Sequence, residues 1–483
     1  MKPIRETNKL QIGIDLGTTY SSISFFNIDK KQPDPIKENG GSTSFPSMVA
    51  LARMMNEITF QTGYQAKNAF SLYTLSNSKR LIGKTFLDFK RMGSEKDSFP
   101  FDVEKGENNM CMMVVSNPLD ENKNEKFYPE EVSGMILKGL VDKVKNVMNN
   151  NPFGNIVVTI PVKFSPKQRK ATLRACQIAG LNNVTLLNEP SASLIEYKRY
   201  IKNSHDEKTK QKELKNGDIV LVIDFGGGTL DVCCCKIVDI DGNDDSIIEV
   251  IEIDGDQDLG GKNFDEIIKK LFMNRLTDDV KTKLTIKGTD TQKMKNTKKK
   301  RIMKMMNEIE DVKIQLSTQS FVQIQLEKIL GEEYDDEIPI SKEEFETECM
   351  KELIPRFKEI IENVLSDSNI RKDEIKLILP IGGTCRIPLV RNVINEMFPN
   401  EEQMAEATFD PLTAVANGAA YHAFRLSLQN EKQDIIEVMP YSIGVETIFI
   451  ILELLYNYRG QNIFYWSRKF LPLKVRKNRG IDI

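Results

Sequence analysis

Residues 220–231 constrain this chain most, because they join an apolar run to three successive glycines. The segment reads Val-Leu-Val-Ile-Asp-Phe-Gly-Gly-Gly-Thr-Leu-Asp. A run rich in β-branched residues predicts a buried strand. Glycines let backbone N–H groups approach a phosphate with no Cβ in the way, and Asp224 at the strand end suits a hydrated Mg²⁺ that accompanies phosphates. Taken alone, such a turn is more often a plain hairpin.

A second copy of this plan lies near the N-terminus. Residues 12–19 read Ile-Gly-Ile-Asp-Leu-Gly-Thr-Thr, again an apolar strand, an aspartate and a small polar turn. Two such hairpins predict duplicated halves that face each other across one nucleotide.

Length and composition exclude several classes of protein. At 483 residues the chain is too long for one core, so we expect two or more domains of roughly 100–200 residues each. The net charge of -3 gives no pull towards nucleic acid or anionic membrane. The N-terminus lacks an apolar signal core, and seven cysteines without Cys-x-x-Cys spacing, beside 2 histidines, argue against a disulfide framework or zinc site. We therefore expect a cytoplasmic protein with no nucleic-acid partner and no membrane span.

Several other segments allow a structural or a functional interpretation. Cys233, Cys234 and Cys235 lie in a predicted strand, where successive side chains alternate between faces, so buried small side chains are favoured over a metal site. The basic run 281–304 has no interleaved aromatics, which favours a solvated helix or loop over a nucleic-acid site. Residues 88–126 are polar and predict an irregular inserted subdomain.

Two later segments add candidate nucleotide contacts. Glu310, Lys313 and Ser317 lie along one edge of a predicted helix, where they either line a cleft wall or form an ordinary ion pair. Residues 382–388 form a second glycine-rich turn between a strand and a helix, which suits phosphate or ribose contact at a helix N-terminus. Lys79, beside Arg80, would by itself be interpreted as part of a solvated pair.

Taken together, these motifs resemble the heat shock protein 70 chaperones, from about Leu10 to Thr447. The segments that carry the resemblance, in family order, are 13–21, 79–83, 168–172, 178–181, 188–190, 224–231, 259–261, 382–388 and 410–411. The resemblance implies an α/β, actin-like ATPase fold: two ribonuclease-H-like lobes with inserted subdomains around a central nucleotide cleft. It implies lobe I at 1–204 with an insertion at about 40–128, lobe II at 205–406 with an insertion at about 262–345, and a return helix at 407–432.

The resemblance also implies roles for individual residues around bound ATP or ADP. Contacts at the phosphate end are implied for Gly17, Thr18, Thr19, Tyr20, Gly226, Gly227, Gly228, Thr229 and Gly260. Ribose, base and neighbouring contacts are implied for Glu310, Lys313, Ser317, Gly382, Gly383, Arg386 and Asp410. Mg²⁺ would be held by Asp15, Asp224 and Glu189, and K⁺ by Asp231. The implied catalytic residues are Lys79, Glu189, Thr229 and Asp224, with Lys79 orienting or activating the water that attacks the γ-phosphate.

Some positions depart from the family pattern. Pro380 replaces an apolar strand residue and removes a ladder hydrogen bond there, and Asn417 replaces an aromatic. Lys163 replaces a tyrosine after Pro161, in the segment that, with Arg169, matches the family's relay from Glu189 to the lobe surface. Thr185 replaces the arginine that engages the J-domain co-chaperone.

The C-terminal residues depart most. Residues 433–447 resemble the interdomain linker and the first strand of the peptide-binding domain, and 448–483 are unassigned. We therefore do not expect binding of unfolded-protein clients through a complete peptide-binding domain. The resemblance leads us to expect a monomer with a J-domain co-chaperone and a nucleotide exchange factor as partners.

Two functions follow from this comparison. The first is a slow ATP-hydrolysing chaperone of heat shock protein 70 type, in which turnover switches lobe closure. The alternative is a non-catalytic ATP-binding regulator, or exchange-factor-like partner, of other chaperones. A sugar or glycerol kinase on the same fold is a distant third.

Overall fold

The computed structural model describes most of the chain in two compact units. The described residues are 9–38, 40–69, 71–92, 99–120, 122–239, 246–428, 435–436, 455–456 and 462–463. The units are Met1–Ile436 and Glu437–Ile483. In the second unit, β20 (Leu455–Tyr456) pairs antiparallel with β21 (Asn462–Ile463). The rest of the expected linker, strand remnant and tail lies outside the described residues, apart from 435–436.

The first sheet of the first unit is built around the N-terminal hairpin. Its strand order is β12 (Val184–Asn188), β11 (Phe153–Ile160), β1 (Leu10–Asp15), β2 (Tyr20–Asn27) and β3 (Gln32–Pro35), with β4 (Phe45–Pro46) pairing β2. β1 is parallel to β11 and antiparallel to β2. Asp15 therefore lies at the end of a buried strand, beside the turn to β2.

The second sheet repeats this plan. Its order is β18 (Ile375–Ile381), β13 (Ile219–Phe225), β14 (Leu230–Asp239), β15 (Ser246–Asp256) and β19 (Ile435–Ile436). β13 is parallel to β18 and antiparallel to β14, as β1 is to β11 and β2. The prediction of duplicated halves is confirmed. Residues 435–436, within the expected linker, extend the edge of this sheet parallel to β15.

Helices bury two separate cores against these sheets. One core joins the first sheet to α4 (Pro129–Val147) and α5 (Pro166–Ile178). The other joins the second sheet to α8 (Gly261–Arg275), α13 (Ile354–Ser368) and α14 (Pro388–Met397). α5 begins at Pro166, and the Ser165 side chain before it accepts a hydrogen bond from the Gln168 backbone N–H.

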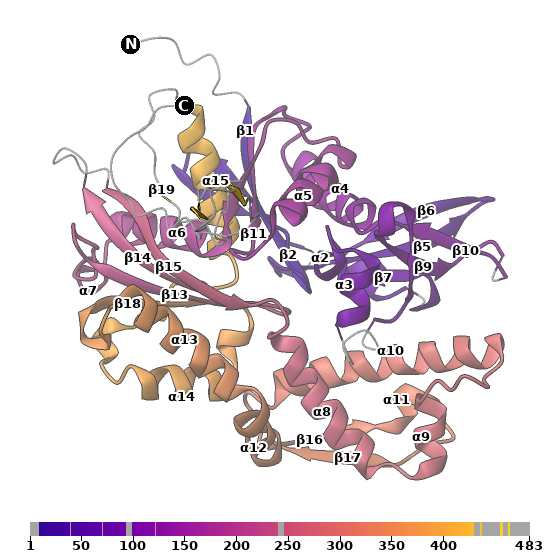
Figure 1. Ribbon diagram of the computed structural model, residues 1–483. Helices are drawn as coiled ribbons and strands as arrows, with labels where there is room; N and C mark the ends of the chain where they lie inside the picture. The colour runs from indigo at the N-terminus through magenta and orange to yellow at the C-terminus, as the bar shows by residue number, and fades with distance from the viewer. Residues whose placement is uncertain are drawn as a thin grey trace. The chain divides into compact units, whose positions relative to one another are not determined.

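Two further helices, α6 (Glu189–Asn203) and α15 (Ala414–Ser427), pack against each other. α15 also lies against β1, β2 and β11 (Figure 1). Its small residues allow this approach. A Cβ added at Gly418 would lie 1.7 Å from the Ala192 carbonyl oxygen in α6. Asn417, in place of an aromatic, instead accepts a 2.6 Å hydrogen bond from the Ser24 hydroxyl.

The first insertion is more regular than the sequence predicts. β5 (Met48–Met54) pairs with β6 (Glu57–Thr62) and β7 (Thr74–Ser76), and the short α1 (Tyr64–Lys67) follows β6. The prediction of an irregular segment at 88–126 is wrong. It contains β8 (Asp102–Lys105), β9 (Cys111–Ser116) and β10 (Asn124–Phe127), which form a three-stranded sheet, and the apolar run of β9 supplies its buried side chains.

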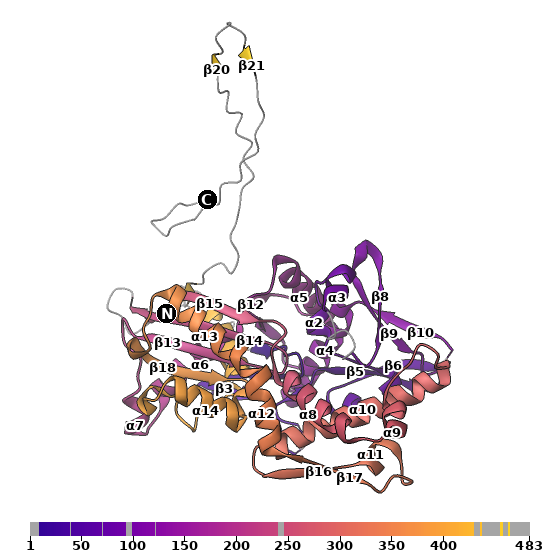
Figure 2. The ribbon, with the colours of Figure 1, turned by 60° about the horizontal axis from the view of Figure 1, so that its bottom comes forward.

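The second insertion follows the second glycine hairpin. It comprises α8, α9 (Asp278–Leu284), α10 (Gln292–Gln315), α11 (Leu326–Leu330) and the hairpin of β16 (Phe321–Gln325) and β17 (Glu337–Ser341). The basic run at 281–304 thus falls largely within α9 and α10. Figure 2 shows these elements together, and Lys299 of α10 forms a 2.9 Å ion pair with Asp102 of the first insertion.

The remaining described elements are short connections or caps. They are α2 (Ser78–Leu81), α3 (Phe86–Arg91), α7 (Glu207–Lys210) and α12 (Lys342–Glu352), with the 3₁₀ turns Ser71–Tyr73, Glu107–Asn109, Lys372–Glu374, Thr384–Arg386 and Glu401–Gln403. No helix among the described residues is long and apolar enough to cross a membrane.

Two unusual sequence features have structural explanations. Pro380 lies opposite Ile223 in β18, which is an edge strand of its sheet, and a sheet tolerates proline at its edge. Cys233, Cys234 and Cys235 are buried in β14. Alternation places Cys233 and Cys235 on one face, with their sulfurs 3.3 Å apart, so the expectation that the thiols diverge applies only to Cys234.

The close packing of α15 gives a first prediction. Gly418→Ala should lower the free energy of unfolding by roughly 3 kcal/mol, since its Cβ would overlap the α6 backbone. Urea denaturation followed by circular dichroism measures the change. Gly288→Ala is the matched control, because no atom lies within 4 Å of a Cβ there. Equal stability of the two variants would contradict this packing.

Candidate functional site

A cavity of about 870 Å³ lies between the two glycine hairpins. This volume falls within the range of about 300–1,000 Å³ that is usual for small-molecule sites. Its walls are the β1–β2 turn, the β13–β14 turn, the start of α8, one edge of α10, the turn after β18 and the residues before α15. The strand plan brings these segments together although they are far apart in the sequence.

The two hairpin turns approach each other closely at one end of the cavity. A Cβ added at Gly227 would lie 2.3 Å from the Thr19 hydroxyl oxygen, and one at Gly228 would lie 2.7 Å from Thr18 Cγ2. Only glycine therefore fits in the second turn. Backbone hydrogen bonds attach α8 to the same turn, because Gly261 N–H donates to the Gly226 carbonyl at 3.1 Å. The result is a surface of backbone amides and small hydroxyls that suits phosphate oxygens.

Lys79 and Glu189 form a buried ion pair in the cavity. The Lys79 ammonium donates to Glu189 Oε1 at 2.5 Å, and each side chain is only 7% exposed. Burial alone lowers the pKa of Lys79, but the neighbouring Glu189 and Asp15 carboxylates raise it above its usual value. These carboxylates therefore favour the protonated, positively charged form of Lys79.

Three buried aspartates surround this ion pair. Burial, followed by repulsion from Glu189, raises the pKa of Asp15 and of Asp231 to about 7. The same causes raise the pKa of Asp224 well above its usual value. Asp231 Oδ2 is buried with no hydrogen-bond partner among the described residues. This excess of negative charge suits bound cations with oxygen ligands.

The carboxylates do not converge on a single point. No group of three or more His, Cys, Asp or Glu side chains in the described ranges is placed to hold a metal ion. Their oxygens fit a hydrated Mg²⁺, which keeps several water ligands and takes few from the protein.

α10 supplies the opposite wall of the cavity. Glu310 accepts hydrogen bonds from Tyr20 Oη at 3.0 Å and from Lys67 Nζ at 2.9 Å, so it connects the two insertions across the cavity. Burial and the Glu310 carboxylate raise the pKa of Tyr20 to about 12. Lys313 pairs with Asp265 of α8 at 2.7 Å. The i,i+3 ion-pair interpretation of Glu310 and Lys313 is wrong, because each residue has another partner.

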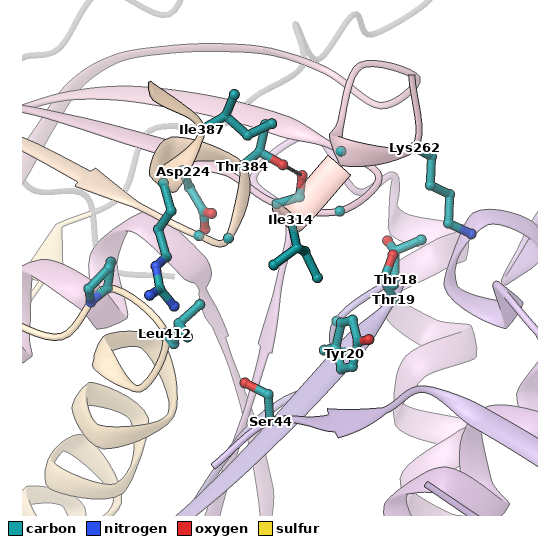
Figure 3. A pocket seen from close by; sticks show the side chains of 18 of the residues that line it. Thr18, Thr19, Tyr20, Ser44, Asp224, Lys262, Ile314, Thr384, Ile387 and Leu412 are labelled. Carbon is teal, nitrogen blue, oxygen red and sulfur yellow. Dashed lines mark hydrogen bonds between the residues drawn. The ribbon is translucent and has the colours of Figure 1, made fainter. Parts of the chain in front are cut away.

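Part of the cavity wall is apolar. It includes Ile314, Ile387 and Leu412 (Figure 3), and Arg386 also lines the cavity. Ile314 is 59% exposed, which is unusual for an aliphatic side chain on a helix that faces a cavity. Apolar side chains of this kind can contact the faces of a planar ring.

Most of the predicted site residues line this cavity. These are Asp15, Gly17, Thr18, Thr19, Tyr20, Lys79, Glu189, Asp224, Gly226, Gly227, Glu310, Lys313, Ser317, Gly382, Gly383 and Arg386. Gly228, Thr229, Asp231, Gly260 and Asp410 are not among the lining residues. Gly228 and Gly260 pack against each other behind the turn.

Thr229 and Asp410 have structural positions. The Thr229 carbonyl accepts a 3.0 Å hydrogen bond from Gly226 N–H, which closes the glycine turn. Exposed Asp410 accepts hydrogen bonds from Leu412 N–H and the Thr413 hydroxyl, which hold the turn before α15. The neighbours Pro411 and Leu412 reach the cavity instead.

Sequence reasoning did not assign several of the lining residues, among them Lys262, Asp265, Ile314 and Leu412. Lys262 directly follows the predicted Gly260-Gly261 turn, and Ile314 directly follows Lys313, so proximity to predicted contacts was the available signal.

The segment after Pro161 connects this site with the second sheet. Arg169 Nη2 donates at 3.2 Å both to Asn188 Oδ1, next to Glu189, and to the Val162 carbonyl. Lys163, which replaces a tyrosine, forms an ion pair with Asp254 of β15. This chain of contacts begins beside the Lys79–Glu189 pair and ends on the other sheet.

The raised pKa of Asp15 gives a prediction about the protein without nucleotide or metal. Ionised Asp15 is disfavoured in the folded state, so its stabilising contribution is complete below about pH 4 and is lost as the pH rises through 7. Asp15→Asn should therefore raise the Tm above that of the unsubstituted protein by roughly 2 °C or more at pH 8, and less at pH 5. Thermal unfolding in EDTA measures this difference. Asp142→Asn, which changes a partly exposed aspartate of α4, is the control, and a pH-independent difference for Asp15→Asn would contradict the assignment.

Comparison with known proteins identifies the family. Residues 11–457 match the family model described as Hsp70 protein. The heat shock cognate 70 kDa protein 3 of Dictyostelium discoideum is 32% identical over 445 residues, which cover 90% of this chain and 64% of that protein. The chain thus spans just under two thirds of the length of that relative. Its paired α/β sheets agree with the actin-like ATPase fold of the family. Since the match runs through both sheets and every wall of the cavity, the chain belongs to the Hsp70 family.

Proposed function

We propose that this chain is an ATP-dependent chaperone of Hsp70 type, which binds Mg-ATP in the cavity and hydrolyses it slowly to ADP. The observation that carries the proposal is the buried Lys79–Glu189 pair at the cavity end where the two hairpin turns approach each other. A fixed cation and backbone amides at that end provide what phosphoryl transfer to water requires, namely positioning and neutralisation of charge.

The phosphates would lie between the hairpin turns. Backbone N–H groups around Thr18 and Gly227 would donate to phosphate oxygens, with Gly17, Thr19, Tyr20 and Gly226 completing the surface. Gly228, Thr229 and Gly260 would support this surface from behind, since none of them lines the cavity.

Cations would balance the buried aspartates. Asp15 and Asp224 would hold a hydrated Mg²⁺, with Glu189 ordering its water shell, and the unpartnered Asp231 Oδ2 would contact K⁺. Mg²⁺ would supply neutralisation of charge on the phosphate oxygens.

Lys79 would act as a fixed cation rather than as a base. Its raised pKa keeps it charged, so it would orient the attacking water and stabilise negative charge that develops on the γ-phosphate. Glu189 would hold Lys79 in place and accept a hydrogen bond from the water.

The nucleoside would occupy the α10 end. Glu310 and Lys313 would contact the ribose, and Ser317 the adenine. Arg386 would stack on one face of the base above the Gly382-Gly383 turn, with Ile314 on the other face. The Tyr20–Glu310 and Lys67–Glu310 contacts would have to loosen for nucleotide to enter, since they bridge the cavity.

Turnover would change the angle between two lobes, which we assign to 1–204 and 205–406, with the return helix at 407–432. ATP and ADP would favour different angles because only ATP connects all the phosphate contacts. The Arg169 and Lys163 contacts would transmit this difference to the second sheet. A J-domain co-chaperone and a nucleotide exchange factor are the proposed partners.

One observation favours a second function, a nucleotide-binding regulator of other chaperones. Thr229, an implied catalytic residue, does not line the cavity. Such a regulator would bind ATP without turning it over.

Single-turnover hydrolysis of γ-labelled ATP separates the two functions. Lys79→Ala should lower the rate about 100-fold, because it removes the only fixed cation paired with Glu189 among the described residues, while ATP still binds. Lys90→Ala, an exposed lysine on α3, should leave the rate unchanged.

Equal rates for the unsubstituted protein and Lys79→Ala would contradict the hydrolytic role of this lysine. ATP binding without any turnover in the unsubstituted protein would instead support the regulator.

A further inference from the structure

Lys262 is a lysine of the cavity wall without a partner. Its side chain is half-buried and lines the cavity, yet no hydrogen bond or ion pair reaches its ammonium from the described part of the chain. The other lysines of the cavity region are all paired: Lys67 with Glu310, Lys79 with Glu189, and Lys313 with Asp265. A cavity lysine without an anionic partner is therefore the exception.

The backbone holds Lys262 at the phosphate end. Its N–H donates to the Gly227 carbonyl at 3.0 Å, and Gly227 lies against Thr19 of the opposite hairpin. Figure 3 shows the Lys262 side chain with its ammonium on the same side of the cavity as Thr18 and Thr19. A long cationic side chain that starts one hydrogen bond from the glycine turn can reach a group held between the two turns.

The carboxylates nearest Lys262 are already paired with other lysines. Burial and the nearby Arg80 guanidinium lower its pKa to about 7, and Lys313 acts in the same direction. Asp265 and Glu310 oppose this effect more weakly, and each already has a lysine partner. A bound anion would relieve this repulsion and keep the lysine protonated.

We propose that Lys262 is a binding residue for the terminal phosphate of the nucleotide, in addition to the residues already assigned. The inference rests on the proposed function, because it places the nucleotide's phosphates between the hairpin turns. The recognised chemistry is a phosphate group, either the γ-phosphate of ATP or the inorganic phosphate that hydrolysis releases. Lys262 would donate a charge-assisted hydrogen bond to it from the α8 side of the cavity.

The competing interpretation is a solvated lysine at the cavity mouth. Such a residue would contribute equally little to the binding of all nucleotides. A phosphate contact instead discriminates between nucleotides according to their terminal phosphate, and this difference provides the test.

Isothermal titration calorimetry of the full chain with Mg²⁺ measures that discrimination. The probes are AMP-PNP, ADP, and inorganic phosphate added to the ADP complex. Lys262→Ala should weaken AMP-PNP about 10-fold, corresponding to one charge-assisted hydrogen bond, and ADP less than about twofold. Lys262→Arg should retain most of the AMP-PNP affinity, and Lys270→Ala, an exposed lysine on the same helix, should match the unsubstituted protein.

The three titrations distinguish the two sources of phosphate. Loss of AMP-PNP affinity identifies the γ-phosphate, whereas an unchanged AMP-PNP affinity with lost phosphate binding to the ADP complex identifies the released ion. Unchanged affinity for all three probes, or equal loss for AMP-PNP and ADP, overturns the proposal and leaves nucleotide binding intact. If the unsubstituted protein binds no nucleotide, the proposed function fails as well. Lys262→Gln, which removes the charge but keeps most of the side-chain length, keeps the test decisive should Lys262→Ala fold poorly, because it too should weaken AMP-PNP about 10-fold.

Discussion

The repulsion among buried carboxylates is the constraint on which the site depends. Three aspartates lie near Glu189 inside the protein: Asp15, Asp224 and Asp231. Burial and repulsion from Glu189 raise the pKa of each, because the ionised form is unfavourable there. Lys79 balances one negative charge. The remaining negative charge favours a bound cation, which is why the proposed function places Mg²⁺ beside these aspartates.

Close packing through small side chains holds the carboxylates in place. Each sheet buries its own core, while α15 and α6 approach at Gly418 and Ala192 more closely than any larger side chain would allow. Glu189 is the first residue of α6, so this packing also sets the position of the charged pair. Stability and site geometry therefore share the same contacts.

Polar contacts join the two insertions and the two sheets around the site. Glu310 joins Tyr20 and Lys67 across the cavity, and Lys163 joins Asp254 next to the Arg169 segment. These ion pairs are partly exposed, so each is worth little alone and can break and re-form as ligands change. Movable contacts of this kind, around a rigid pair of hairpins, suit a cavity that opens and closes.

The sequence by itself determined the repeated hairpins, because strand patterns and glycine turns are local properties. The family resemblance of its motifs also pointed to most of the residues that line the cavity. The sequence did not predict the sheet at 102–127, since those strands are stabilised by pairing across the sheet. Tertiary structure alone decided the partners of Glu310 and Lys313 and left Lys262 without one among the described residues. It also placed Asp410 outside the lining of the cavity. Each of these depends on which distant side chains lie within hydrogen-bond range, and chain spacing does not contain that information.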